Sequence, residues 1–308
     1  MEADRTDPIL FVGAPRSGTT IVFEQFALHP DLAWVLNYAR NAPRLPSINL
    51  LRRLVDNRWI NLRGAKNQFG DLGLWNKYLP RPDESYELWT AHSNAQFARG
   101  YLLGQRATER ERRQLRKVIE ATRKYQGHPR ITAKLTGPGR VRYLSSVWPE
   151  TYIVNIIRDG LDVVKSLLNV AFWKSQGGLE QPWWSGGLTD SDLERWETWG
   201  RDPGVLAALQ WRKIVETTRE EASALAPDHY IELRYETFAA DPAETISEVY
   251  RKVGLDPARD PDIHLAPRNQ SYGDDWDDEY RQKLITCMQP TYTELGYDQL
   301  RSTHATHI

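Results

Sequence analysis

The chain has 308 residues, enough for one large α/β domain or two small ones with a buried core. With 40 basic and 41 acidic residues its formal net charge is −1, so no overall basic excess indicates a nucleic-acid partner, and any anion site must be local. A single cysteine, Cys287, excludes an internal disulfide framework and a multi-cysteine metal site, and is typical of a reducing compartment.

The N-terminal segment is polar and leads directly into an apolar run, without the hydrophobic region of a signal peptide. No stretch approaches about 18 consecutive apolar residues, the length that a membrane-spanning helix needs. We therefore expect a cytoplasmic protein without a membrane span.

Four short apolar runs predict strands that are covered on both faces. These runs are residues 8–15, 130–137, 151–159 and 229–238. Helical patterns follow the first, third and fourth runs, which favours a mainly parallel sheet with right-handed crossovers. We expect a P-loop-like, three-layer α/β/α fold whose ligands bind at the carboxyl ends of the strands. Four polar residues fall at these ends: Arg16, Lys134, Arg158 and Tyr235.

Residues 41–128 form a mostly helical insertion after the first strand. Within it, residues 45–59 are amphipathic and basic, so they could lie on a membrane surface, line a binding cleft, or form an ordinary packed helix. Residues 106–125 are highly charged and predict a solvated helix with i,i+4 ion pairs.

Residues 175–204 form a second segment that does not fit the alternation of strands and helices, and it is rich in glycine and tryptophan. A loop of this length is usually functional or disordered, and its tryptophans argue against disorder. They could fill the core, or could form flat surfaces around a substrate such as a sugar. We expect one α/β domain over residues 1–308, with both segments covering the substrate side.

The stretch FVGAPRSGTT, residues 11–20, has the spacing of a phosphate-binding loop but lacks its lysine. Gly13 and Gly18 allow a tight turn with inward N–H groups, and the following helix adds its positive N-terminal end. Thr19 stands at the lysine position, and the cation is Arg16 within the loop. The pattern predicts an anion site, although glycines can also acquire this spacing by chance.

A second element, NIIRDGLDVVKSLL, places Arg158 at a strand end and Ser166 eight residues later, in the next helix. Arg158 could clamp a second phosphate while Ser166 hydrogen-bonds to it. An arginine at a strand end can equally pair with a carboxylate.

In this order, the two elements resemble the sulfotransferases that use 3′-phosphoadenosine-5′-phosphosulfate (PAPS). In that family a P-[KR]-S-G-T-[TS] loop holds the 5′-phosphosulfate, and an R-x7-S strand–helix element holds the 3′-phosphate. PRSGTT and the pair Arg158 and Ser166 match both. AKLTGP resembles the family's EKTP-like element, with Lys134 on its lysine and Ala133 in place of the glutamate.

Two later motifs extend the resemblance. RYETF is similar to the family's RYEDL strand end, which implies that Tyr235 lies near the adenine, and RNQSYGDDW resembles the late loop that completes the 3′-phosphate pocket. The resemblance thus assigns these residues to PAPS binding: Pro15, Arg16, Ser17, Gly18, Thr19, Thr20, Arg158, Ser166, Tyr235, Arg268, Tyr272 and Gly273.

The resemblance implies transfer of a sulfuryl group from PAPS without a metal. A transferring sulfonate carries less charge than a γ-phosphate, and Arg158 stands where a Walker-B strand would present an aspartate to Mg²⁺. Arg16 would stabilise charge on the phosphosulfate, and Lys134 would approach the bridging oxygen. The alternatives are a P-loop kinase, or a non-catalytic nucleotide- or glycan-binding module of the same fold.

The general base is not at its usual place. Several family members carry a glutamate shortly after the HPD that closes the first helix, but no carboxylate or histidine lies between Asp31 and Arg40. RPDESYELWTAHSN offers other candidates, of which we favour Glu84, because the segment is similar to one in bacterial members, and then His92. The acceptor is expected to be a hydroxyl or amine of a small molecule, saccharide or lipid-linked compound.

Overall fold

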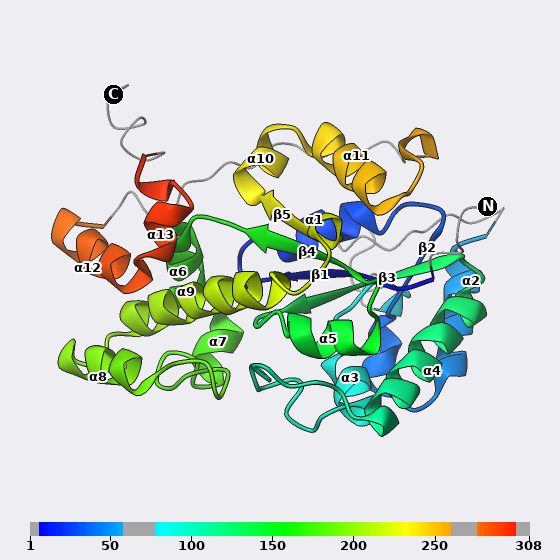
Figure 1. Cartoon of the computed structure of the whole chain (residues 1–308), viewed down its shortest axis with the longest axis horizontal. Helices are drawn as coiled ribbons and strands as arrows, with labels where there is room; N and C mark the ends of the chain where they lie inside the picture. Colours follow the sequence, from blue (N-terminus) through cyan, green and yellow to red (C-terminus); the bar gives the residue numbers. More distant parts are fainter. Residues whose placement is uncertain (1–5, 58–77, 260–275, 300–308) are drawn as a thin grey trace.

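The computed structural model describes residues 6–57, 78–259 and 276–299. Its core is a five-stranded sheet in the order β2-β3-β1-β4-β5, in which each neighbouring pair is parallel (Figure 1). The strands are β1 (Ile9–Gly13), β2 (Leu32–Trp34), β3 (Arg130–Thr136), β4 (Tyr152–Ile157) and β5 (Tyr230–Arg234). The expectation of a mainly parallel sheet is confirmed.

Helices occupy most of the remaining chain. They are α1 (Thr19–Phe26), α2 (Arg52–Val55), α3 (Tyr86–His92), α4 (Glu109–Gln126), α5 (Val141–Val147), α6 (Gly160–Leu168), α7 (Ala171–Ser175), α8 (Asp190–Thr198), α9 (Pro203–Ala222), α10 (Tyr235–Ala240), α11 (Pro242–Val253), α12 (Asp278–Met288) and α13 (Thr291–Glu294). Short 3₁₀ turns cover Asn37–Arg40, Pro46–Leu51, Pro227–His229 and Pro257–Arg259.

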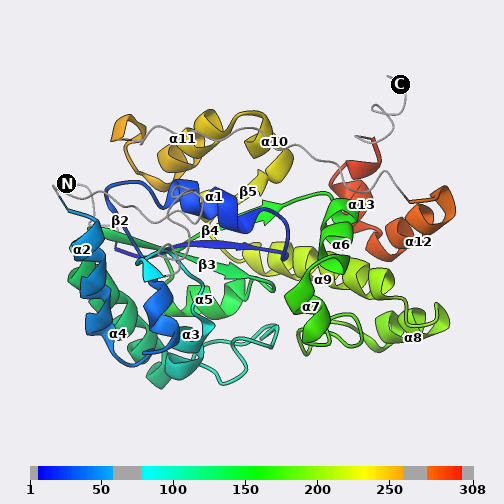
Figure 2. The ribbon, with the colours of Figure 1, turned by 180° about the vertical axis from the view of Figure 1, so that it is seen from behind.

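The sheet is buried on both faces, because successive side chains of a strand point to opposite sides. Leu10 and Val12 of β1 pack with buried residues of α3, α4 and α5. Ile9 and Phe11 of the same strand pack with α1, α10 and α11. Figures 1 and 2 show α10 and α11 on one side of the sheet and α5 on the other. The three-layer α/β/α expectation is therefore confirmed.

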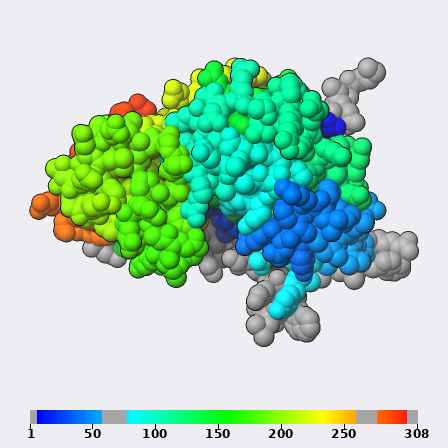
Figure 3. All heavy atoms as spheres, turned by 90° about the horizontal axis from the view of Figure 1, so that it is seen from below, coloured from blue at the N-terminus to red at the C-terminus, as the bar shows by residue number. Residues whose placement is uncertain are grey.

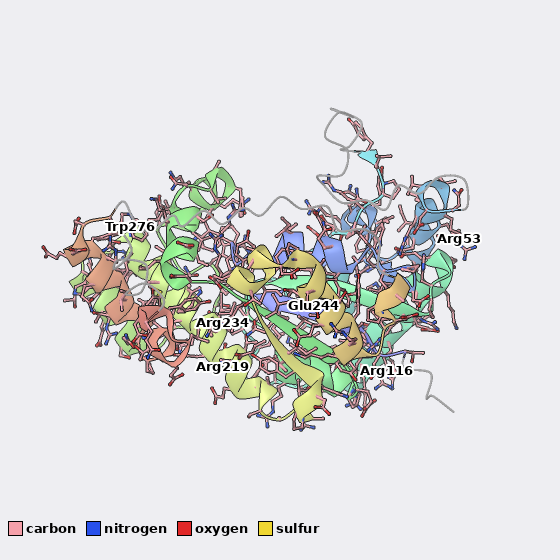
Figure 4. All side chains as sticks on the ribbon, turned by 90° about the horizontal axis from the view of Figure 1, so that it is seen from above. Arg53, Arg116, Arg219, Arg234, Glu244 and Trp276 are labelled. Atoms are coloured by element: carbon pink, nitrogen blue, oxygen red, sulfur yellow. The ribbon has the colours of Figure 1, made fainter. Side chains whose placement is uncertain are left out.

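A third apolar cluster lies beyond the carboxyl edge of β4. It joins α6, α7, α8 and α9 to α12 and α13, and its largest buried side chains include Trp173 and Trp211. Figure 4 shows Arg234 at the end of β5, and its guanidinium donates a hydrogen bond to the backbone oxygen of Leu295 after α13. The C-terminal helices are thus attached to the same edge of the sheet as the predicted site.

Strand β2 was not predicted from the sequence, and the predicted end of β5 lies too far along the chain. Strand β2 has three residues, and the side-chain amide of Gln126 pairs with both backbone groups of Trp34, so a side chain rather than a further strand completes this edge. The run predicted as a strand over 229–238 ends at Arg234, and Tyr235 begins α10. An apolar run does not distinguish a strand from a short helix by composition alone.

The structure distinguishes between the alternatives considered for two segments. Residues 175–204 contain α8, which begins with a capping box between Thr189 and Asp192, so this is not one long loop. In the segment 45–59, the Arg52 side chain is buried and stacks on Trp34 with its guanidinium carbon 4.3 Å from the ring centroid. Arg52 therefore packs inside the protein, as in the packed-helix alternative.

Across the described residues, no helix combines the length and the apolar character that crossing a lipid bilayer requires.

Cys287 on α12 is fully buried, and burial raises the pKa of its thiol to about 11. Because the thiolate is the reactive form, we expect negligible modification of the native protein by an aromatic disulfide reagent at pH 8 and one equivalent after unfolding in guanidinium chloride. Absorbance of the released thiolate measures both. Rapid labelling of one thiol in the native protein would contradict the packing of α12.

Candidate active site

The turn between β1 and α1 depends on two glycines. A Cβ on Gly13 would lie 2.4 Å from the backbone oxygen of Ile156 on the neighbouring strand. Gly18 precedes α1 with φ of +82°, and a Cβ there would lie 2.2 Å from the Tyr235 ring. Both positions exclude side chains, so the loop passes close to β4 and to the start of α10.

The same turn contains two unusual polar residues. Arg16 has φ of +71°, a left-handed conformation that is strained for a non-glycine residue. Ser17 is fully buried, and its hydroxyl has no hydrogen-bond partner within the described ranges. A buried unpaired donor and a strained arginine before a helix N-terminus are features expected of an anion site.

The structure brings the loop together with the R-x7-S element. The Arg16 Nε donates a 2.8 Å hydrogen bond to the hydroxyl of Ser166 on α6. Arg158, after β4, donates a 3.4 Å hydrogen bond to the backbone oxygen of Arg16, and its guanidinium carbon lies 4.8 Å from the Tyr235 ring centroid. Arg158 also pairs with Asp162 at 3.2 Å, so the carboxylate contact considered from the sequence exists beside the predicted phosphate site.

Buried side chains from the C-terminal helices support this turn. The Asp159 backbone N–H donates to Glu236 Oε1 at 2.9 Å, and the Asp159 carboxylate accepts a hydrogen bond from the Tyr292 hydroxyl at 3.3 Å. The Tyr297 hydroxyl donates to the other oxygen of Glu236 at 3.3 Å. Burial raises the pKa of Glu236 above its ordinary value. Asp159, the residue after Arg158, is thus held by Glu236 at its backbone and by Tyr292 at its side chain.

Lys134 and Glu84 meet beside the loop. The Lys134 ammonium lies 2.8 Å from Glu84 Oε1 and donates a 2.7 Å hydrogen bond to the hydroxyl of Thr20. The Thr136 hydroxyl donates to the same carboxylate oxygen of Glu84. Because β3 is parallel to β1, with Gly13 opposite Thr136, the lysine strand and the loop end at the same edge.

A constrained turn presents Glu84. Ser85 has φ of +42°, and both its backbone N–H and its hydroxyl donate to Asp83 Oδ1, at 2.8 and 3.0 Å. The Trp89 indole donates a 3.0 Å hydrogen bond to the backbone oxygen of Glu84. Strained residues that several hydrogen bonds hold in place are frequent at functional sites.

These groups border a cavity of about 440 Å³. Its lining residues are Pro15, Arg16, Thr19, Thr20, Glu84, Tyr86, Glu87, Ala98, Arg99, Thr136, Phe172, Trp173, Trp183 and Trp184. In Figure 3 a hollow lies between the green part of the surface and the cyan part, and dark-blue atoms from the start of the chain are visible in it. The loop at residues 15–20 therefore forms one wall, and the Trp-rich segment at 175–204 forms another.

The tryptophans of this wall pack against one another, as the core interpretation expects, and their contact with a substrate stays a prediction. Trp173 and Trp184 are only 1% and 5% exposed, and Trp183 stacks on Trp173 with ring centroids 4.4 Å apart. They belong to the core and also border the cavity. Few of their ring faces are open for a sugar to stack on.

Most predicted site residues of the described ranges lie together, but His92 does not. Its Nε2 lies 3.0 Å from the backbone oxygen of Pro43, and it is not among the residues that line the cavity. Its catalytic role stays a prediction without support from this arrangement. Arg268, Tyr272 and Gly273 lie outside the described residues.

The cavity also has lining residues that were not predicted from the sequence, among them Tyr86, Arg99, Thr136 and Phe172. Thr136 could have been found, because it follows Lys134 by two positions on the same strand and therefore shares its face. Tyr86 donates a hydrogen bond to the Thr136 backbone oxygen, and burial raises its pKa. No local pattern distinguishes the other two from ordinary surface residues.

Within residues 6–57, 78–259 and 276–299, no three histidine, cysteine, aspartate or glutamate side chains form a group that could hold a metal ion. The expectation of metal-free chemistry stays a prediction.

A sequence model described as the sulfotransferase family matches residues 8–260, most of the chain. The chain belongs to the sulfotransferase family. The resemblance drawn from the two sequence elements is thereby confirmed, and the protein is a sulfotransferase. No curated protein sequence matches it.

Solved structures with similar folds include other sulfotransferases. STF9 from Mycobacterium avium is 17% identical with a TM-score of 0.49, over 92% of this chain and 76% of that one. A sulfotransferase from Alicyclobacillus acidocaldarius is 14% identical with a TM-score of 0.46, over 93% and 92%. Mouse SULT7A1 complexed with PAP is 12% identical with a TM-score of 0.43, over 98% and 90%.

Gly18→Ala tests the close approach of the loop to Tyr235. The added methyl group overlaps the ring, so we expect displacement of the loop and at least about tenfold weaker binding of adenosine 3′,5′-bisphosphate (PAP), measured by calorimetry. Gly200→Ala is the matched control, because Gly200 has φ of +70° but no atom within 4 Å of the added group. Equal PAP affinity in the two variants would contradict this geometry.

Proposed function

We propose that the loop at residues 15–20 holds the phosphosulfate end of PAPS and that Arg158 and Ser166 bind its 3′-phosphate. The sulfuryl group passes to a hydroxyl or amine of a small-molecule, saccharide or lipid-linked acceptor in the cavity, and PAP is released. The observation that carries this proposal is the position of Lys134, whose ammonium contacts Thr20 of the loop and Glu84 of the cavity wall.

The residues present fit the proposed ligand. Ser17 provides a buried hydroxyl without a partner in the described part of the chain, and the N–H groups before α1 lie at the positive end of a helix. Arg16 and Arg158 add two cations, and Tyr235 lies against both Gly18 and Arg158. Two cations and an aromatic ring suit a nucleotide with phosphates at both ends.

PAPS, when bound, supplies an activated sulfuryl group. Arg16 and the loop N–H groups stabilise its negative charge in place, and Lys134 stabilises the charge that develops on the leaving oxygen. Glu84 accepts the proton of the acceptor hydroxyl or amine as the new bond to sulfur forms and the bond to the bridging oxygen breaks. Lys134 and Thr136 orient the Glu84 carboxylate for this step.

The insertion at 41–128 and the Trp-rich segment at 175–204 would cover the acceptor side of one domain spanning residues 1–308. Glu84, Tyr86 and Ala98 come from the insertion, and Trp183 and Trp184 come from the Trp-rich segment. This arrangement supports a role in acceptor binding.

Arg158→Ala tests the 3′-phosphate site. Loss of a charge-assisted hydrogen bond should weaken binding of PAP by at least about tenfold, while binding of adenosine 5′-monophosphate, which lacks the 3′-phosphate, changes little. Calorimetric titration of both nucleotides measures the ratio. Ser166→Ala serves as a milder second variant, because Arg158→Ala also leaves the buried Asp162 without its 3.2 Å partner.

Two results would overturn the nucleotide assignment. The first is an unchanged ratio of PAP to adenosine 5′-monophosphate affinity in both folded variants. The second is tight binding of ATP with Mg²⁺ to the wild type without binding of PAP, which is the result that a P-loop kinase predicts.

Glu84→Gln tests the general base. Removal of a base typically lowers turnover by about 10²–10⁴-fold, and we expect such a loss with little change in PAP affinity. Transfer of labelled sulfate from PAPS to an acceptor panel measures turnover. Glu248→Gln, an exposed change on α11, is the control for loss of one carboxylate. Retained turnover in Glu84→Gln, with a large loss in His92→Gln, would transfer the role to His92.

A further inference from the structure

Arg99 occupies a fixed position on the cavity wall. Its backbone oxygen accepts a 2.8 Å hydrogen bond from the backbone N–H of Ser185, and the adjoining Gly100 forms a bridge with the same residue. The insertion and the Trp-rich segment are therefore joined here by backbone contacts. These backbone contacts fix the position of Arg99 relative to Trp183 and Trp184, which precede Ser185 in the chain.

The Arg99 side chain rests on the tryptophan wall. Its guanidinium carbon lies 4.0 Å from the ring centroid of Trp183, and Trp183 stacks on the buried Trp173 with 16° between the ring planes. Stacking on an aromatic face restricts the rotamers of an arginine while its N–H groups stay available at the edge of the plane.

Those N–H groups are unused in the described part of the chain. No hydrogen bond or ion pair of the Arg99 guanidinium occurs there, although the residue lines the cavity. Other charged groups of the cavity have partners: Arg16 contacts Ser166, and Glu84 contacts Lys134. Glu87, which also lines the cavity, pairs with Arg40 at 4.0 Å. A stacked, unpaired guanidinium suits a planar or tetrahedral anion, which it can bind through two N–H groups.

The rest of this wall is apolar. Phe172 is 50% exposed, and Ala98, Trp183 and Trp184 border the same space. An acceptor that fills it would bury an apolar body against these residues. Its polar groups could meet two charged residues of the lining, Glu84 beside the loop and Arg99.

We propose that the acceptor is an amphipathic anion: a hydroxylated, mainly apolar molecule that carries a carboxylate, phosphate or sulfate. Arg99 binds the anionic group and thereby places the hydroxyl at Glu84. This inference rests on the proposed function of the cavity, and it narrows the acceptor from any hydroxyl or amine to one that bears a negative charge.

A pair of probes that differ by one carboxylate group tests the proposal. With PAP bound, the wild type should bind 6-hydroxy-2-naphthoate at least about tenfold more tightly than 2-naphthol, measured by calorimetry. Arg99→Gln should abolish this preference by weakening only the carboxylate probe. Arg99→Lys keeps the positive charge but loses the planar guanidinium that stacks on Trp183, so it should retain part of the preference.

Arg113→Gln is the matched control, because Arg113 is exposed on α4 and does not line the cavity. The proposal is overturned if the wild type shows no preference for the carboxylate or no binding of it. It is also overturned if Arg99→Gln weakens both probes equally, or if Arg113→Gln has the same effect as Arg99→Gln. PAP affinity should be unchanged in every variant, whereas a wild type that does not bind PAP would refute the proposed function itself.

Discussion

Parallel pairing of β1 with β3 and β4 is the constraint on which the site depends. In this register Gly13 lies opposite Thr136, and Val12 lies opposite Asn155, so three strands end at one edge. The glycine loop, the lysine strand and the strand before Arg158 consequently leave the sheet side by side. The close approach of Gly13 to Ile156 is possible only because no side chain separates them.

This arrangement brings the polar side chains at the strand ends into contact with one another. Arg16 contacts Ser166, and Lys134 contacts Thr20 and Glu84, so these polar groups hold one another in place. A site with fixed dipoles and charges needs little reorganisation when negative charge enters it. Tyr292 and Tyr297 add further hydrogen bonds, to Asp159 and Glu236 respectively. Asp159 directly follows Arg158 and also bonds to Glu236.

The strands that are buried on both faces were predictable, because a continuous apolar run bounded by glycine or proline has few alternatives. Strand β2 was not, because three residues carry no periodicity and the Gln126 amide that completes its edge comes from α4. The end of β5 was placed too late because Tyr235, Thr237 and Phe238 are residue types that also favour a strand, although they belong to α10. Tyr235 nevertheless lies against Gly18 and Arg158, two residues assigned to the same pocket, and its place beside the adenine stays a prediction.

The sequence contained the anion loop, the Arg158 and Ser166 pair and the strand lysine, because each depends on local spacing and on strand ends that must share one edge. The tertiary structure decided that Glu84 pairs with Lys134 and that Arg99 borders the cavity against Trp183. Glu84 was a candidate from its segment alone, but its contact with Lys134 was not predictable, and no pattern indicated Arg99. In both contacts the two residues are distant in the chain. Contacts of this kind arise from the packing of whole segments, which no short stretch of residues encodes.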